Sequence, residues 1–405
     1  MTVTTSTGRT TLPWSRLARP DLTFVVAVLV AYVTATAAAV VFDHASPDRM
    51  MLIAERALGG HLDYDGLRNS VDTVNVNGHY YLAVGPLQLL PYLPFAAVPA
   101  LQGIGRYIVG LAFGVPAAWL SLPLARAYGA KAADAYWIAI FTAFGSLLWY
   151  ISVFGDMYFL AHAESFLALT ILLLEWSGRR RPIVLGAALA VSFLARPTTV
   201  LAAVPFGLAL LWQSRMALTA AARSAIAFGL PVAAAIGVYG WYNWVRFGSP
   251  LESGYAISLL RESTLESRRA VGVFSIAHVP ENLRLALLAP LERIGKFPYI
   301  GPSKFGMSML LVSPALLTSI RAGFRDGTAR LLWLAAALVA VPVFLYYGGG
   351  YVQYGFRYSL DFTPFLVALM AMGSQRWIGR PERILILAGV ASVLIGVIIG
   401  IDWHS

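Results

Sequence analysis

The sequence predicts an all-α protein that crosses a membrane many times. Hydrophobic residues occupy 58% of its 405 positions and charged residues only 12%, whereas about 25% of an ordinary globular domain is charged. The apolar residues form repeated runs of about 17 to 24, long enough to cross a bilayer as helices. This composition excludes a secreted globule, a disordered chain and a soluble nucleic-acid-binding protein, despite a net charge of +10.

Eleven apolar segments are predicted to span the membrane and to form one transmembrane domain over residues 1–405. The segments are 22–42, 104–125, 134–152, 158–176, 182–196, 197–213, 222–245, 306–321, 329–347, 360–374 and 384–402. The first is too long, and too poorly followed by a small-residue cleavage site, to be a removable signal peptide. We therefore expect it to remain as the first span.

One further apolar stretch, 85–101, is predicted to lie outside the membrane or on its surface. It contains four prolines, which break a straight spanning helix but suit short segments at the interface. We expect a pair of juxtamembrane helices there.

The basic loops predict the orientation. If 85–101 does not cross, sixteen of the 30 Lys and Arg residues fall in short loops and an N-terminal segment on one side, which the positive-inside rule assigns to the cytoplasm. The N-terminus is then cytoplasmic, the C-terminus lies outside, and the two long loops, 43–103 and 246–305, are both outer loops. These loops hold 11 of the 20 acidic residues, so acid–base chemistry is expected at the outer face.

An amphipathic helix is predicted over residues 47–58 of the first outer loop. Its apolar residues recur at helical spacing, and Gly59 follows as a C-terminal cap. Asp48 lies in the first turn, where the helix dipole favours a carboxylate. The pattern alone leaves two roles open for Asp48, as a stabilising charge or as a catalytic group.

Several blocks of the sequence resemble GT-C glycosyltransferases. In chain order they are IAERALGG, NGHYY, GPLQLLPYL, FGDMYFLAHAE, FLARPTT, YNWVRFGSPLESGY, KFGMSMLLVSP and YVQYGFRYSLDFTPFL. The resemblance is to the branch that contains protein O-mannosyltransferases and the aminoarabinose transferase of lipid A, and to uncharacterised bacterial relatives of that branch. It covers most of the transmembrane chain.

The resemblance implies an inverting glycosyltransferase of the bacterial plasma membrane. It implies a polyprenyl-phosphate sugar donor at the outer face, an envelope acceptor that is a lipid, glycan or protein, and contact with membrane lipids. In the family a carboxylate of the first outer loop is the general base, and the matching residues are Asp48 and, as the alternate, Asp43. The family often has an Asp-Glu pair here, whereas Asp48 precedes Arg49, which offers it an ion-pair partner instead.

Basic residues near the outer ends of spans are predicted to bind the donor phosphate. They are Arg357 in a glycine-rich segment, Arg196 at an RPTT break, and Lys304 before a later span. A guanidinium stays charged and binds phosphate in a bidentate manner. The alternatives are an Arg357–Asp361 pair within one helix, an Arg196 side chain that reaches the interface, and a Lys304 contact with an anionic lipid.

Further polar residues are predicted to contact the substrate. They are His79, Tyr80, Tyr81, His162, Glu164, Gln353, Tyr358 and Asp361. His162 and Glu164 fall within a span, which favours either a polar cavity or a hydrogen bond between helices. The two tyrosines after His79 suit either stacking on a substrate or an aromatic belt at the interface.

No metal or other cofactor is predicted, because the carboxylates do not cluster as a divalent cation requires and cysteine is absent. Motifs of ATP-driven transporters, zinc peptidases and serine hydrolases are also missing. Two other functions stay open: a transporter or flippase of a lipid-linked sugar, and a non-catalytic partner in envelope assembly. Transporters usually have repeat-related halves, and the sequence shows no such repeat.

Overall fold

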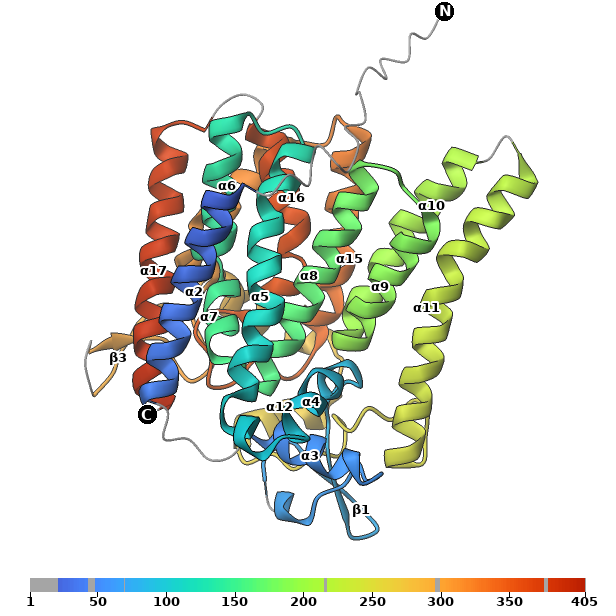
Figure 1. The fold of residues 1–405 in the computed structure, drawn as a ribbon, viewed down its shortest axis with the longest axis vertical. Coiled ribbons are helices and arrows are strands. Elements are labelled where there is room, and N and C mark those ends of the chain that lie inside the picture. Colours follow the sequence, from blue (N-terminus) through green and yellow to red (C-terminus); the bar gives the residue numbers. More distant parts are fainter. Residues whose placement is uncertain are drawn as a thin grey trace, which may run out of the picture.

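The computed structural model describes residues 21–42, 48–68, 70–214, 217–295, 299–374 and 378–404. Long helices run side by side as a bundle, and short helices and hairpins lie against one end of it (Figure 1). The two small sheets are each an antiparallel pair of strands. The prediction of an all-α polytopic fold is therefore confirmed.

Each predicted span coincides with one or more helical segments of the bundle. These are α2 (Leu22–Phe42), α5 (Gln102–Ala127), α6 (Ala132–Phe144), α7 (Leu147–Phe154), α8 (Met157–Ser177), α9 (Pro182–Ala195), η4 (Pro197–Ala202), α10 (Ala203–Ser214), α11 (Leu218–Phe247), α14 (Met309–Val312), η6 (Pro314–Ala322), α15 (Gly327–Leu345), η7 (Arg357–Asp361), α16 (Thr363–Gly373) and α17 (Arg380–His404). By length and composition, six helices in the described residues suffice to cross a membrane, and α6 with α7, bent by 42°, makes a seventh. The remaining segments are shorter.

Helices α2 and α11 turn much of their apolar surface outward. Only 28% of the most apolar window of α2 and 17% of that of α11 is buried inside the protein. Such exposed apolar surface is unfavourable in water and suits a lipid environment. The protein is accordingly a multi-pass membrane protein.

The folded segments of the two long loops are here called the cap. They are α3 (Arg49–Leu58), η1 (Asp65–Leu67), β1 (Thr73–Val76), β2 (His79–Leu82), η2 (Leu87–Tyr92), α4 (Leu93–Ala96), η3 (Pro99–Leu101), α12 (Ser263–Val271), η5 (Ile276–His278), α13 (Val279–Leu287), β3 (Glu292–Arg293) and β4 (Ile300–Gly301). Elements α3, β1, α4 and α12 lie at the lower end of the bundle in Figure 1, and β3 projects from its left side. The stretch 85–101 is thus broken into η2, α4 and η3 rather than forming one continuous helix, as its prolines predict.

The two long loops contact each other within this cap. The backbone N–H of Asp72 donates to the Leu259 carbonyl at 2.8 Å, and the Leu259 N–H donates to the Thr73 carbonyl at 2.8 Å. Arg246, at the end of α11, donates from Nη1 to the Leu82 carbonyl at 2.6 Å. Residues far apart in the sequence therefore meet over one end of the bundle.

The connection between α5 and α6 and the connection between α8 and α9 lie at the opposite, upper end in Figure 1. Arg126 and Arg181 flank these connections. Arg126 pairs with Asp21 at 3.9 Å and Arg181 with Glu175 at 2.8 Å, and Arg321 of η6 pairs with Glu382 of α17. The fold thus separates these basic connections from the cap. This separation is the arrangement on which the predicted orientation depends.

Helices α9 and α11 pack closely at Gly186, and this contact makes a first prediction. A Cβ atom on Gly186 would lie 2.1 Å from the Phe228 carbonyl oxygen, so the helices must move apart to accept it. We expect Gly186→Ala to lower the free energy of unfolding by about 1–3 kcal/mol, measured by thermal unfolding in detergent. Gly229→Ala on α11 is the matched control, because a Cβ there meets nothing within 4 Å. Equal unfolding temperatures for the two variants would contradict the close packing.

Candidate active site

A pocket opens where the cap meets the bundle. Its charged lining residues, among those that the structure describes, are Asp72, Arg196 and Arg357. The lining also contains seven tyrosines: Tyr158, Tyr239, Tyr255, Tyr346, Tyr347, Tyr351 and Tyr358. Both long loops, the start of α8, the break after α9 and the glycine-rich segment before η7 contribute to it. Hydroxyl groups and ring faces of this kind suit a polar ligand with an anionic group.

Arg196 lies at the break between two helices. Helix α9 ends at Ala195, Arg196 has an extended backbone with φ −137°, and Pro197 begins η4. The guanidinium then points to Asp361, donating from Nη2 to Oδ2 at 2.8 Å and from Nε to both carboxylate oxygens at 3.1 Å. Arg196 is thus in the pocket wall, but its charge is balanced by a buried carboxylate.

Asp361 is the centre of a buried polar cluster. Besides Arg196, it accepts a hydrogen bond from Thr198 Oγ1 at 3.1 Å and contacts Nδ1 of His162 at 2.8 Å. The alternative predicted from the sequence, an ion pair between Asp361 and Arg357, is wrong, because Asp361 pairs with Arg196 instead. His162 and Asp361 therefore support the pocket from behind its lining.

Arg357 occupies the pocket without a carboxylate partner. It is 8% exposed, and Nη1 donates to the Tyr351 carbonyl at 3.2 Å. Its Nε is buried and has no hydrogen-bond partner, and no carboxylate in the described part of the chain lies within 4 Å of the guanidinium. The guanidinium carbon lies 5.2 Å from the ring centre of Tyr358. A buried charge without a counterion is costly, so this arrangement suits an anionic ligand.

Tyr358 lies between the two pocket arginines. Its ring centre is 5.1 Å from the Arg196 guanidinium and 5.2 Å from that of Arg357. Two cation–π contacts on one ring fix the spacing of the two charges. Of the residues predicted to contact the substrate, Tyr358 is the one found in the lining of the pocket among the described residues.

Other residues predicted for the site lie elsewhere. Lys304 pairs with Glu262 at 2.8 Å and does not line the pocket. His79, in β2, contacts Asp63 at 2.8 Å. Tyr80 and Tyr81 follow it in the hairpin, also outside the lining, and Tyr81 packs edge-on against Phe247.

Gln353 and Glu164 are buried and do not line the pocket. Gln353 donates from Nε2 to the carbonyls of Phe305 and Gly349, and so holds the glycine-rich segment in place. Glu164 is buried in α8, and neither of its carboxyl oxygens has a hydrogen-bond partner in the described residues. The structure offers no explanation for an acidic residue at that position.

Asp48 caps helix α3 outside the pocket. Its Oδ1 accepts from the Met50 N–H at 2.9 Å, and its Oδ2 is buried without a hydrogen-bond partner in the described residues. Burial, followed by the nearby negative charge of Asp156, raises the pKa of Asp48 to about 6. Asp43, the alternate candidate, lies outside the described residues.

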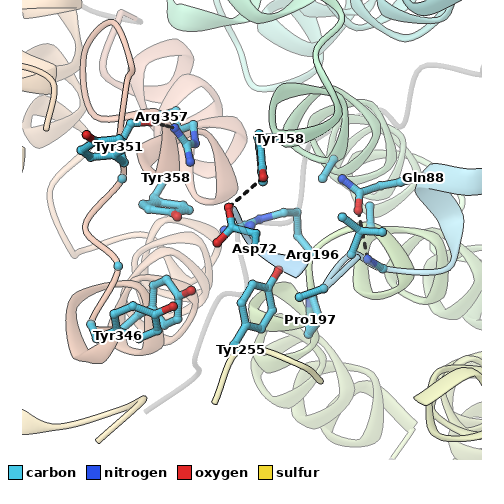
Figure 2. A pocket seen from close by; sticks show the side chains of 18 of the residues that line it. Asp72, Gln88, Tyr158, Arg196, Pro197, Tyr255, Tyr346, Tyr351, Arg357 and Tyr358 are labelled. Carbon is cyan, nitrogen blue, oxygen red and sulfur yellow. Dashed lines mark hydrogen bonds between the residues drawn. The ribbon is translucent and has the colours of Figure 1, made fainter. Parts of the chain in front are cut away.

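Among the described residues, Asp72 is the carboxylate that lines the pocket, and it is not one of the site residues predicted from the sequence. It lies at the centre of the pocket in Figure 2, with Tyr158, Tyr358 and Arg196 around it. Its Oδ2 accepts from the Tyr158 hydroxyl at 2.7 Å. Arg49 donates to the same hydroxyl at 2.9 Å and to the Val71 carbonyl at 2.7 Å, so it turns toward Asp72 and not toward Asp48. The sequence signal was slight: an acidic residue just before a hairpin strand.

The raised pKa of Asp48 predicts how pH affects stability. The pKa of this carboxyl is 3.8 in the unfolded chain and about 6 in the folded protein. The free energy of unfolding therefore falls as pH rises from about 3.8 to about 6, because the folded protein favours the protonated carboxyl. Asp48→Asn keeps the cap acceptor but carries no charge. We expect it to raise the free energy of unfolding by up to about 3 kcal/mol at pH 8 and hardly at all at pH 4, measured by thermal unfolding. Asp65→Asn, at an exposed position of the same loop, is the control. An Asp48→Asn effect that is equal at the two pH values would contradict the assignment.

Comparisons with known proteins place the fold. No family model and no curated protein matches the chain. Among solved structures it is similar to ArnT from Cupriavidus metallidurans bound to undecaprenyl phosphate, with a TM-score of 0.54 and 15% sequence identity over 92% of this chain. The chain spans 64% of the length of ArnT. Within the described residues there is no group of three or more His, Asp or Glu side chains placed to hold a metal ion. The protein therefore has a fold similar to that of ArnT.

Proposed function

We propose that the protein is a membrane glycosyltransferase that takes a sugar from a polyprenyl-phosphate donor. The proposal rests on Arg357. Its buried guanidinium lines the pocket and has no carboxylate partner among the described residues. A phosphate supplies the missing charge and accepts from the unpartnered Nε. The fold agrees with this ligand, since ArnT was crystallised with undecaprenyl phosphate.

The pocket suits both parts of such a donor. It lies at the junction of cap and bundle, where a polyprenyl chain can stay in the lipid while its phosphate reaches Arg357. The tyrosines on the other walls offer hydroxyls for hydrogen bonds and ring faces for stacking against a sugar. As the bond from sugar to phosphate breaks, negative charge grows on the phosphate, and a fixed guanidinium stabilises that charge.

We further infer the face, the outcome and the acceptor of the reaction. Cap residues contribute to the pocket, and cap elements lie at the end of the bundle opposite to the short basic connections (Figure 1). With the positive-inside rule, this arrangement supports a pocket at the outer face. A single displacement, in which the acceptor attacks from the side opposite to the phosphate, inverts the anomeric carbon. The acceptor is an envelope molecule with a free hydroxyl, either lipid, glycan or protein.

The test is a transfer assay with purified protein in lipid nanodiscs. We expect loss of one of a set of polyprenyl-phosphate sugars and release of polyprenyl phosphate when outer-envelope extract is added, with markedly slower turnover by Arg357→Ala. In proteoliposomes, movement of an intact donor across the bilayer would instead support a flippase. Binding of polyprenyl phosphate without turnover of any donor would support the non-catalytic alternative.

A further inference from the structure

We propose that Asp72 is the general base of the transfer, and that Tyr158 and Arg49 are positioning residues that hold its carboxylate. This inference rests on the proposed transferase function. Among the described residues, Asp72 is the carboxylate in the pocket lining, and the unpaired Arg357 belongs to the same lining. A proton acceptor and a phosphate-binding cation thus face one space.

The side chain of Asp72 is held by one oxygen and free at the other. Oδ2 accepts from the Tyr158 hydroxyl at 2.7 Å, and Arg49 Nη2 donates to the oxygen of that hydroxyl at 2.9 Å. Because the guanidinium can only donate, the Tyr158 proton must point to Asp72. Oδ1 has no hydrogen-bond partner in the described part of the chain. It is therefore available to an acceptor hydroxyl.

The backbone of Asp72 is fixed by both long loops. Its N–H donates to the Leu259 carbonyl at 2.8 Å, and its carbonyl accepts from the Ala83 N–H at 3.3 Å. Its φ is +61°, a left-handed conformation that is unfavourable for a residue with a side chain. The surrounding hydrogen bonds maintain this conformation, and the side chain is directed into the pocket as Figure 2 shows.

Asp48 lacks the access that a general base needs. A base must come within about 2.6–3.2 Å of the oxygen whose proton it takes. One oxygen of Asp48 caps α3, the other is buried, and the residue does not line the pocket. Asp72, in contrast, lines the pocket, where an acceptor hydroxyl can approach it.

The proposed step is a single displacement. The acceptor O–H bond breaks and its proton passes to Oδ1 of Asp72, while the acceptor oxygen forms a bond to the anomeric carbon. The bond from that carbon to the phosphate oxygen breaks, and its electron pair stays on the polyprenyl phosphate, whose charge Arg357 balances. Asp72 then releases the proton to water. The products are the glycosylated acceptor and polyprenyl phosphate.

The test compares Asp72→Asn with Asp48→Asn in the transfer assay. We expect Asp72→Asn to lower kcat by about 10²–10⁴-fold while polyprenyl-phosphate binding and the unfolding temperature stay within error of the wild type. Asp48→Asn and the exposed control Asp65→Asn should keep kcat within about twofold. Wild-type turnover by Asp72→Asn would overturn this inference and leave the transferase function standing. A wild-type protein that turns over no donor would overturn both.

Tyr158→Phe tests the positioning role separately. The variant removes the hydrogen bond that orients the carboxylate of Asp72. We expect kcat to fall while the KM for donor and the unfolding temperature stay at the wild-type values, and we expect Tyr158→Phe to cause no further fall when it is added to Asp72→Asn. An equal fall in the Asp72→Asn background would indicate that Tyr158 does not act through Asp72 and would overturn its assigned role.

Discussion

Arg357→Ala is expected to lower kcat/KM for the polyprenyl-phosphate donor by about 10- to 100-fold. A hydrogen bond to a charged group contributes about 1.5–3 kcal/mol, and Arg357 offers an unpartnered Nε to the pocket, with no ion pair to a carboxylate of the described residues. The loss should affect both KM and kcat, because phosphate is present in the bound donor and gains charge as it leaves. Steady-state kinetics over a range of donor concentrations measure the two effects.

Two further variants make this test specific. Arg357→Lys keeps the charge but loses the planar fork, and should recover part of the binding but not the full rate. Arg284→Ala is the matched control, because Arg284 is an exposed arginine of the cap that pairs with its neighbour Glu281. Unchanged turnover in Arg357→Ala would remove this residue from the site. Protein stability should change little in any of the three.

The bundle could be predicted from the sequence because a bilayer demands long apolar helices. Runs such as 22–42 contain no charge and become helix α2 with the predicted bounds. The prolines of 85–101 predicted a broken segment for a local reason, since proline cannot donate a backbone hydrogen bond. Helix α3 was also predictable, from an amphipathic pattern and a capping aspartate.

The site was less predictable because its contacts join distant parts of the chain. Asp361 lies four residues after Arg357, and the helical spacing offered a pair between them as an alternative. In the structure Asp361 pairs instead with Arg196, which is 165 positions away in the sequence. Asp72 reaches the pocket because two loops converge, as its bond to Leu259 shows. No pattern within a short stretch of the sequence predicts either contact.

Asp361→Ala is expected to lower the free energy of unfolding by about 3–5 kcal/mol, the usual cost of removing one partner of a buried ion pair. Asp361 is fully buried and Arg196 only 16% exposed at its side chain, so solvent cannot replace the lost carboxylate. His162 and Thr198 lose their partner as well. Thermal and denaturant unfolding in detergent measure the change. Glu281→Ala, at the exposed Arg284–Glu281 pair, is the control and should leave stability nearly unchanged.

The double variant Arg196→Met/Asp361→Leu tests whether the charge of Arg196 mainly balances Asp361 or is available to the donor phosphate. If Arg196 serves mainly to balance Asp361, removing both charges leaves no buried ion, and the double variant should be clearly more stable than Asp361→Ala. The coupling energy from the cycle of single and double variants should then reach about 1 kcal/mol or more. Single-variant losses that add without coupling would mean that Arg196 acts independently of Asp361. In that case its guanidinium is available to the donor phosphate beside Arg357, and polyprenyl-phosphate binding should weaken in Arg196→Met as much as in Arg357→Ala.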